Sequence, residues 1–166
     1  MLSFGIDPGS QRTGWAAVRS QGSQLFPVDY GVIRVRGELA DRLVEIFEGL
    51  TVLLADLRPD VVFLESVFHQ KNAQSALTLG HARGVALLAA RRSAPACAEI
   101  TPAEVKKAVT GRGRADKEQV QHMIKALLGL EEVPPNDAAD ALAVAVAGAA
   151  RARFGQALEA ARSVTP

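Results

Sequence analysis

The chain has 166 residues, of which 48% are hydrophobic and 22% charged, and its formal net charge is +1. This length and apolar content predict one compact domain, and the near-neutral charge excludes nucleic-acid binding through overall basicity alone. The longest uncharged apolar run, Ala141 to Ala150, is far shorter than the roughly 20 residues of a membrane-spanning helix, so no membrane segment is expected. The single cysteine, Cys97, has apolar neighbours that suit a buried side chain in a protein of the reducing cytoplasm.

The first part of the chain predicts three strands and then a long helix. Leu2 to Ile6 is a short apolar strand, and Gly14 to Arg19 and Gln24 to Arg36 are two further strand-like runs. Their short connections favour an antiparallel meander. Leucines and other apolar residues then recur at helical spacing from about Glu38 to Leu57, and Pro59 ends that helix.

The middle of the chain alternates strands and helices. Val61 to Leu64 is an uninterrupted apolar run, which indicates a central strand that is buried on both faces. A helix is expected from Ala73 to Arg92, followed by a short strand from Ala96 to Ile100. The tetrad Thr101 to Glu104 is a capping box with proline at the first helical position, so it predicts the start of another helix.

Two helices are expected at the end. Asp116 caps one that ends at Gly129, and the last runs from Asp137 to Ala150. Residues 1–153 are expected to form the single domain, with 154–166 as a tail that is partly disordered. The succession of elements predicts a mixed five-stranded α/β sheet, an antiparallel meander followed by parallel strands, with helices on both faces.

Asp7 and Glu65 each stand at the end of an apolar strand. Asp7 lies where the chain turns, so its carboxylate is expected to project from the edge of the sheet, although a turn aspartate can equally stabilise the Asp-Pro-Gly turn. Glu65 occupies a position where a charge is costly unless it is paired, bound to a metal or open to solvent. Each residue alone also has an ordinary structural explanation.

Asp137 and Asp140 lie three residues apart at the start of an apolar helix, which puts both on one face. Acidic residues there also favour the helix dipole, which is the ordinary explanation. Beside two strand-end carboxylates, however, they would form a strongly repelling group that hard divalent cations relieve. The four together predict a Mg²⁺ or Mn²⁺ site, and no cluster of Cys or His indicates zinc.

Several short motifs occur together in a characteristic order. They are Gly5-Ile6-Asp7-Pro8-Gly9-Ser10, Thr13-Gly14, Leu64-Glu65-Ser66-Val67-Phe68, Lys71-Asn72-Ala73 and Asp137-Ala138-Ala139-Asp140-Ala141-Leu142. The ordered set closely resembles the RuvC family of bacterial Holliday junction resolvases, and the match extends to about Ala147.

That resemblance implies a ribonuclease H-like fold, a homodimer and Mg²⁺-dependent paired nicking of opposite strands at a four-way DNA junction, in recombination and repair. The catalytic, metal-binding carboxylates that match the family are Asp7, Glu65, Asp137 and Asp140. Two Mg²⁺ ions are expected per active site, with Mn²⁺ as a substitute, and the products should carry 5′-phosphate and 3′-hydroxyl ends. The resemblance also implies cooperation with the RuvA and RuvB branch-migration proteins.

The segment from Thr101 to Lys117 carries the local basic charge, with five basic residues against two acidic ones. Such a run is more often a solvated face than a binding site. Given the resemblance, Lys106 and Lys117 are expected to contact backbone phosphates near the cut, and Arg112 and Arg114 to clamp neighbouring strands.

Two further features have both a functional and a structural interpretation. Phe68, just past Glu65, is expected to stack on an unpaired base at the opened crossover, although a core phenylalanine is the plain alternative. Gly80 and Gly84, four apart on one helix, permit close approach of another helix, either across a dimer or within the chain. The three histidines are expected to be non-catalytic: His69, His81 and His122.

Three other functions are compatible with parts of this pattern. Sugar kinases and actin-like ATPases also begin with a strand and an acidic, glycine-rich turn, but this chain is too short for their duplicated core. Another ribonuclease H-like nuclease acting on RNA would share the turn and the carboxylates. A non-catalytic junction-binding protein is the third, although loss of activity should have removed carboxylates that are all present here.

Overall fold

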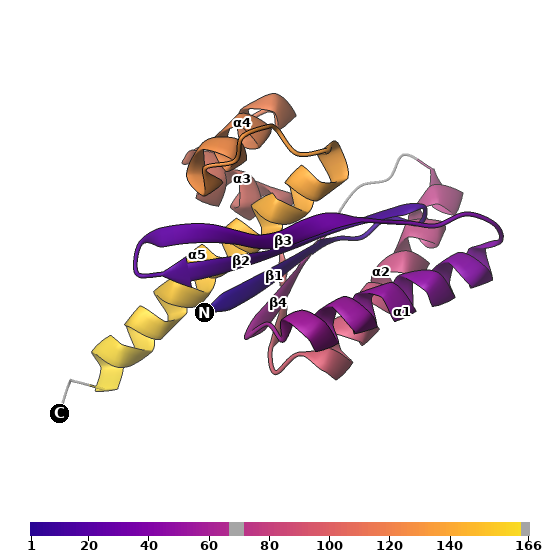
Figure 1. Ribbon diagram of the computed structural model, residues 1–166, viewed down its shortest axis with the longest axis horizontal. Coiled ribbons are helices and arrows are strands. Elements are labelled where there is room, and N and C mark those ends of the chain that lie inside the picture. The colour runs from indigo at the N-terminus through magenta and orange to yellow at the C-terminus, as the bar shows by residue number, and fades with distance from the viewer. Residues whose placement is uncertain (67–71, 164–166) are drawn as a thin grey trace.

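The computed structural model describes residues 1–66 and 72–163, with side chains as far as residue 155. Figure 1 shows a sheet with helices packed on both of its faces. The strands are β1 (Leu2–Asp7), β2 (Arg12–Gln21), β3 (Gln24–Arg34), β4 (Val61–Glu65) and β5 (Cys97–Ile100). The helices are α1 (Leu39–Leu57), α2 (Ala73–Ser93), α3 (Pro102–Thr110), α4 (Lys117–Leu128) and α5 (Asn136–Ser163).

The five strands form one mixed sheet in the order β3-β2-β1-β4-β5. The first three strands pair antiparallel, and β4 and β5 add in parallel on the other side of β1. A tight turn joins β2 to β3, and Gly22 adopts a φ of 57° there, which a residue without a side chain accommodates readily. The predicted meander followed by parallel strands is therefore confirmed.

The two faces of the sheet carry different helices. Helices α1 and α2 pack on one face over Phe4, Ile6 and Leu64, whereas α3, α4 and α5 cover the other face over Ala16 and Phe63 (Figure 1). Strand β4 contributes residues to both clusters, and its neighbour β1 is buried from Leu2 to Ile6, so these two strands form the buried centre of the sheet. The carboxyl ends of these two strands are the natural place for a polar site.

Several helix boundaries follow from the caps that the sequence predicts. Thr101 and Glu104 form the capping box that opens α3, and Asp116 with Gln119 forms a second capping box at α4. Gly129 ends α4 with a φ of 62°, in the left-handed region that favours glycine. Side-chain oxygens thereby satisfy backbone N–H groups that the first helical turn leaves without acceptors.

Two details differ from expectation. Helix α5 continues to Ser163 instead of ending at Ala150, because residues 151–163 contain strong helix formers and no proline. Cys97 is half-buried at the edge of the core rather than fully inside it, and burial raises the pKa of its thiol. Within residues 1–66 and 72–163, no helix is long and apolar enough to cross a membrane.

Candidate active site

Asp7 and Glu65 come from neighbouring parallel strands. Ile6 of β1 stands opposite Leu64 of β4, so the residues that follow them, Asp7 and Glu65, emerge side by side at the same edge of the sheet. Both side chains are half-buried. The strand register, rather than sequence proximity, therefore brings the first two predicted carboxylates together.

Two glycines let the third element of the site, helix α5, lie directly on the sheet. A Cβ atom on Gly5 would clash with the backbone of Ala141 and Ala145, and one on Gly14 would clash with the carbonyl group of Asp137. Gly14 is also the β-partner of Asp7. The start of α5 consequently sits against the end of β1, with Asp137 and Asp140 on its first turns.

The electrostatics of Asp7 indicate that the four carboxylates share one site. Burial, followed by the negative charges of Glu65, Asp140 and Asp137, raises the pKa of Asp7 to about 7. Burial and the charge of Asp140 likewise raise the pKa of Glu65. Carboxylates from three separate elements thus influence one another electrostatically in the folded chain.

Cationic side chains accompany these acids. Lys117 Nζ donates to Asp140 Oδ2 at 2.7 Å, and Arg12 Nη1 lies 3.9 Å from Asp137 Oδ2. Burial acts to lower the pKa of Lys117, but the hydrogen bond and charge of Asp140, with the charges of other carboxylates, raise it overall. Lys117 is therefore held protonated beside the acidic group.

A cavity of about 230 Å³ opens between the carboxylates and helices α3 and α4. Glu65 and Asp140 line it together with Lys106 and Lys117, and its remaining walls are mostly apolar. Because Lys106 and Glu65 line the same cavity, the charge of this lysine acts to lower the pKa of Glu65. The cavity therefore combines anionic groups with two cations that can bind a phosphate.

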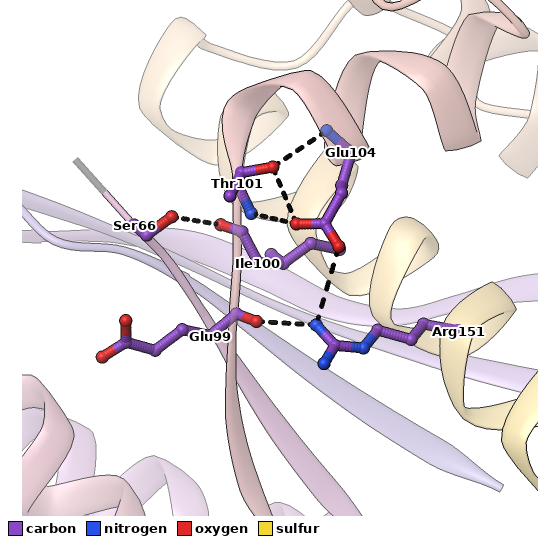
Figure 2. Close-up of polar contacts among 6 residues, drawn as sticks. All are labelled: Ser66, Glu99, Ile100, Thr101, Glu104 and Arg151. Atoms are coloured by element: carbon purple, nitrogen blue, oxygen red, sulfur yellow. Dashed lines mark hydrogen bonds and ion pairs between the residues drawn. The ribbon is translucent and has the colours of Figure 1, made fainter. Parts of the chain in front are cut away.

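Ser66, which directly follows Glu65, is anchored by a polar network (Figure 2). The backbone N–H and the hydroxyl of Ser66 both donate to the carbonyl of Ile100, at 2.8 and 3.2 Å. Arg151 of α5 donates to the carbonyl of Glu99 at 2.8 Å and lies 3.9 Å from Glu104. These bonds tie the ends of β4 and β5 to α3 and α5, and so fix where Glu65 and Lys106 stand.

Two further predicted DNA contacts do not line this cavity. Arg112 and Arg114 are exposed in the loop between α3 and α4, and neither makes an ion pair within the described residues. Lys107 points to solvent, in contrast to the half-buried Lys106. Phe68 and His69 lie outside the residues that the structure describes.

Sequence reasoning missed two arginines at this site. Arg12 approaches Asp137, and its position just after the Asp-Pro-Gly turn was the available signal. Arg83 of α2 donates from Nε to the carbonyl of Glu65 at 3.5 Å and pairs with Glu99 at 2.6 Å. Nothing local in α2 distinguishes Arg83 from its basic neighbours, because its role depends on tertiary packing.

The donor chemistry of the site fits a hard divalent cation, since carboxylate oxygens are the ligands such ions prefer. Across residues 1–66 and 72–155, no three Asp, Glu, His or Cys side chains are already arranged around one point as a metal site. Instead, Asp140 is turned toward Lys117 and Asp137 toward Arg12. The residues fit the cation, and joint coordination requires these two aspartates to turn from their cationic partners.

The chain matches one family of known proteins over most of its length. A family model described as "Crossover junction endodeoxyribonuclease RuvC" matches residues 3–148. The crossover junction endodeoxyribonuclease RuvC of Citrifermentans bemidjiense is 51% identical over 148 residues, which cover 88% of this chain and 90% of that protein. That of Pelobacter propionicus is 53% identical over 148 residues, which cover 88% of this chain and 84% of the relative.

Solved structures agree with this result. The Thermus thermophilus RuvC in complex with a Holliday junction substrate superimposes with a TM-score of 0.87 at 34% identity, covering 93% of this chain and 96% of that one. The fowlpox virus Holliday junction resolvase, at 12% identity and a TM-score of 0.52, covers 95% of this chain and 99% of that one and shares the fold alone. The fold is thus the expected ribonuclease H-like one, and the chain belongs to the RuvC family of crossover junction endodeoxyribonucleases.

Proposed function

We propose that this protein is a structure-selective endonuclease that resolves four-way DNA junctions by paired, symmetric nicks in recombination and repair. The observation that carries the proposal is the set of four carboxylates at one sheet edge of a chain that belongs to the RuvC family. Relatives of this chain are named crossover junction endodeoxyribonucleases, and one was solved with a Holliday junction. The catalytic residues in this proposal are Asp7, Glu65, Asp137 and Asp140.

The four carboxylates are also the proposed ligands of the metal cofactor, two Mg²⁺ ions that Mn²⁺ can replace. The chemistry that such ions supply when bound is positive charge that polarises a phosphodiester and activates water at neutral pH. Asp7, central to the group, would hold the ions from the sheet, and Glu65 and the two α5 aspartates would complete the ligand set. Hydrolysis would leave 5′-phosphate and 3′-hydroxyl ends.

The basic residues of α3 and α4 would orient the DNA. Lys106 and Lys117 line the cavity beside the carboxylates, which suits them to hold the backbone phosphate next to the cut. Arg112 and Arg114, exposed in the following loop, would clamp neighbouring strands. Phe68 remains our proposed stacking residue for an unpaired base at the crossover.

Replacing Lys117 with alanine should weaken junction binding about tenfold and lower the salt slope of binding by about one, because one phosphate contact is lost. Binding would be measured by fluorescence anisotropy at several salt concentrations in the presence of chelator. Lys107→Ala is the matched control, since that lysine is exposed on α3 and does not line the cavity. Equal slopes for the two variants would contradict the assignment of Lys117.

A homodimer would bring two active sites to two symmetric strands. Helix α2 is our proposed seam: a Cβ on Gly80 or Gly84 would meet nothing within 4 Å among the described residues, so tight packing within the chain does not explain these glycines. Leu77 and Leu88 on the same helix are 57% and 52% exposed.

The proposal also includes partners and a location. The protein would cooperate with RuvA and RuvB, and it would act in the cytoplasm on chromosomal DNA.

The proposed function is tested on a synthetic mobile four-way junction, with linear duplex and single-stranded RNA as controls. We expect symmetric nicks on the junction alone, with ends that a ligase seals, when Mg²⁺ is present. Chelation should abolish the nicks, and re-addition of Mg²⁺ or Mn²⁺ should restore them. Equal cutting of duplex or RNA would contradict the substrate, whereas binding without cutting would point to a non-catalytic junction-binding protein.

A further inference from the structure

A second concave site lies at the same edge of the sheet, between the ends of β2 and β3 and the start of α1. It is a cavity of about 280 Å³, and four arginines line it: Arg12, Arg34, Arg36 and Arg42. The cavity is open to solvent, because three of these arginines are exposed and Arg42 is half-buried. We refer to it as the arginine pocket.

The positive charge of the arginine pocket is largely uncompensated. Among the ion pairs of residues 1–66 and 72–155, only Arg12 has a carboxylate partner, at the long distance of 3.9 Å from Asp137. Like charges gathered around one cavity repel each other, and a bound anion relieves this repulsion. The pocket therefore favours an anionic ligand.

Arg42 is held in position by one hydrogen bond from its guanidinium group, and its Nε–H donor is not used within the described part of the chain. Its Nη1 donates to the carbonyl of Ser10 at 2.9 Å, which fastens the guanidinium to the turn that follows Asp7. Its Nε is buried and has no hydrogen-bond acceptor among the residues that the structure describes. A buried N–H without an acceptor is unfavourable, and a ligand oxygen would relieve this cost once a small shift of the Arg42 side chain brings Nε to the cavity.

The walls of the arginine pocket are fixed to the active site. Arg12 and Arg34 are paired in the sheet, and the backbone N–H of Val35 donates to the carbonyl of Gln11 at 3.1 Å. Arg12 also contacts Asp137. The carboxylates thus lie between the arginine pocket on one side and the cavity of Lys106 and Lys117 on the other.

We propose that the arginine pocket binds a second backbone phosphate of the DNA strand that is cut, on the opposite side of the carboxylates from Lys106 and Lys117. This inference rests on the proposed function. Guanidinium groups form paired hydrogen bonds with phosphate oxygens. Four of the seven residues that line the pocket are arginines and none is acidic, so its dominant feature is positive charge, which suits a backbone phosphate. Phosphate binding in the arginine pocket and at Lys106 and Lys117 would together hold the scissile bond in register with the carboxylates.

The test uses the double variant Arg34→Gln/Arg36→Gln, which leaves Arg12 beside Asp137 untouched. Its control is Arg19→Gln, because Arg19 is exposed on β2 at the opposite end of that strand. Junction binding is measured with chelator over a range of salt concentrations. The double variant should bind roughly tenfold more weakly, with a salt slope lower by about 0.9, the value for one lost phosphate contact. Arg34→Lys/Arg36→Lys should recover most of the slope.

Junctions that carry a single neutral methylphosphonate near the cut identify the phosphate. One position should weaken wild-type binding severalfold and have no further effect on the double variant, whereas Arg19→Gln should respond like the wild type. The inference is wrong if the double variant matches Arg19→Gln in affinity and salt slope. It is also wrong if a methylphosphonate at each position tested weakens binding by the wild type and by the double variant equally. A wild type that fails to bind the junction contradicts the proposed function instead.

Discussion

Asp7→Asn is expected to abolish junction cleavage, by roughly a thousandfold or more, and at the same time to stabilise the protein in the absence of divalent cations. The loss of cleavage follows from removing the carboxylate at the centre of the proposed metal site, whose electrostatic contribution is worth several kcal/mol. The gain in stability follows from the surroundings of Asp7, where burial and three neighbouring acids disfavour the ionised form.

The direction of the pH dependence can be worked out from the pKa. In the folded protein the pKa of Asp7 is about 7, above the unfolded value of 3.8, so the folded state retains a proton that the unfolded chain has released. The free energy of unfolding therefore falls as pH rises from about 4 to about 7 and then levels off. A shift of this size corresponds to roughly 2 to 4 kcal/mol for a half-buried group.

Urea denaturation at pH 5 and pH 8, with chelator, measures this effect. The wild type should lose stability between the two pH values, and Asp7→Asn should lose much less. Asp56→Asn serves as the control, because Asp56 is exposed on α1. An Asp7→Asn protein that still cuts the junction would contradict the site assignment, and one that is less stable than the wild type at pH 8 would contradict the electrostatic account.

The parts of this molecule that the sequence predicts well are those determined by local chemistry. The Thr101–Glu104 capping box, the Asp116 cap and the glycine at the end of α4 depend on contacts within a few residues, and each stands where expected. The strand run before Glu65 is recognisable because a strand buried on both faces is continuously apolar. The antiparallel meander of the first three strands also followed from the sequence, since short connections favour neighbouring strands.

The features that the sequence did not predict depend mostly on tertiary contacts. The approach of Arg12 to Asp137 and the bond from Arg83 to the carbonyl of Glu65 join segments far apart in the chain. The end of α5 at Ser163 was missed because helix formers continue beyond the apolar stretch. The resemblance supplied the grouping of the carboxylates, whereas the structure supplies its cause, the close seating of α5 on two glycines.

The close packing of α5 against Gly5 and Gly14 predicts a second large effect. Gly14→Ala should lower the free energy of unfolding by roughly 3 kcal/mol and reduce junction cleavage about a hundredfold. The added Cβ would clash with the carbonyl of Asp137 and approach the Cβ of Ala141 at 3.3 Å, and backbone of a packed helix cannot yield as a flexible side chain does. Helix α5 must therefore shift from β2, which moves Asp137 and Asp140 away from Asp7, and small displacements of catalytic groups have large effects on rate.

Gly155→Ala is the matched control, because Gly155 lies on the same helix and a Cβ there would meet nothing within 4 Å among the described residues. That substitution should raise stability by about 0.5 to 1 kcal/mol, since alanine favours a helix over glycine, and should leave cleavage unchanged. Denaturation and single-turnover cleavage of the four-way junction measure both effects. If Gly14→Ala retained wild-type stability and cleavage, α5 would not depend on this close approach, and the carboxylates would have to be held together by another cause, such as the contacts of Lys117 and Arg12 with the two α5 aspartates.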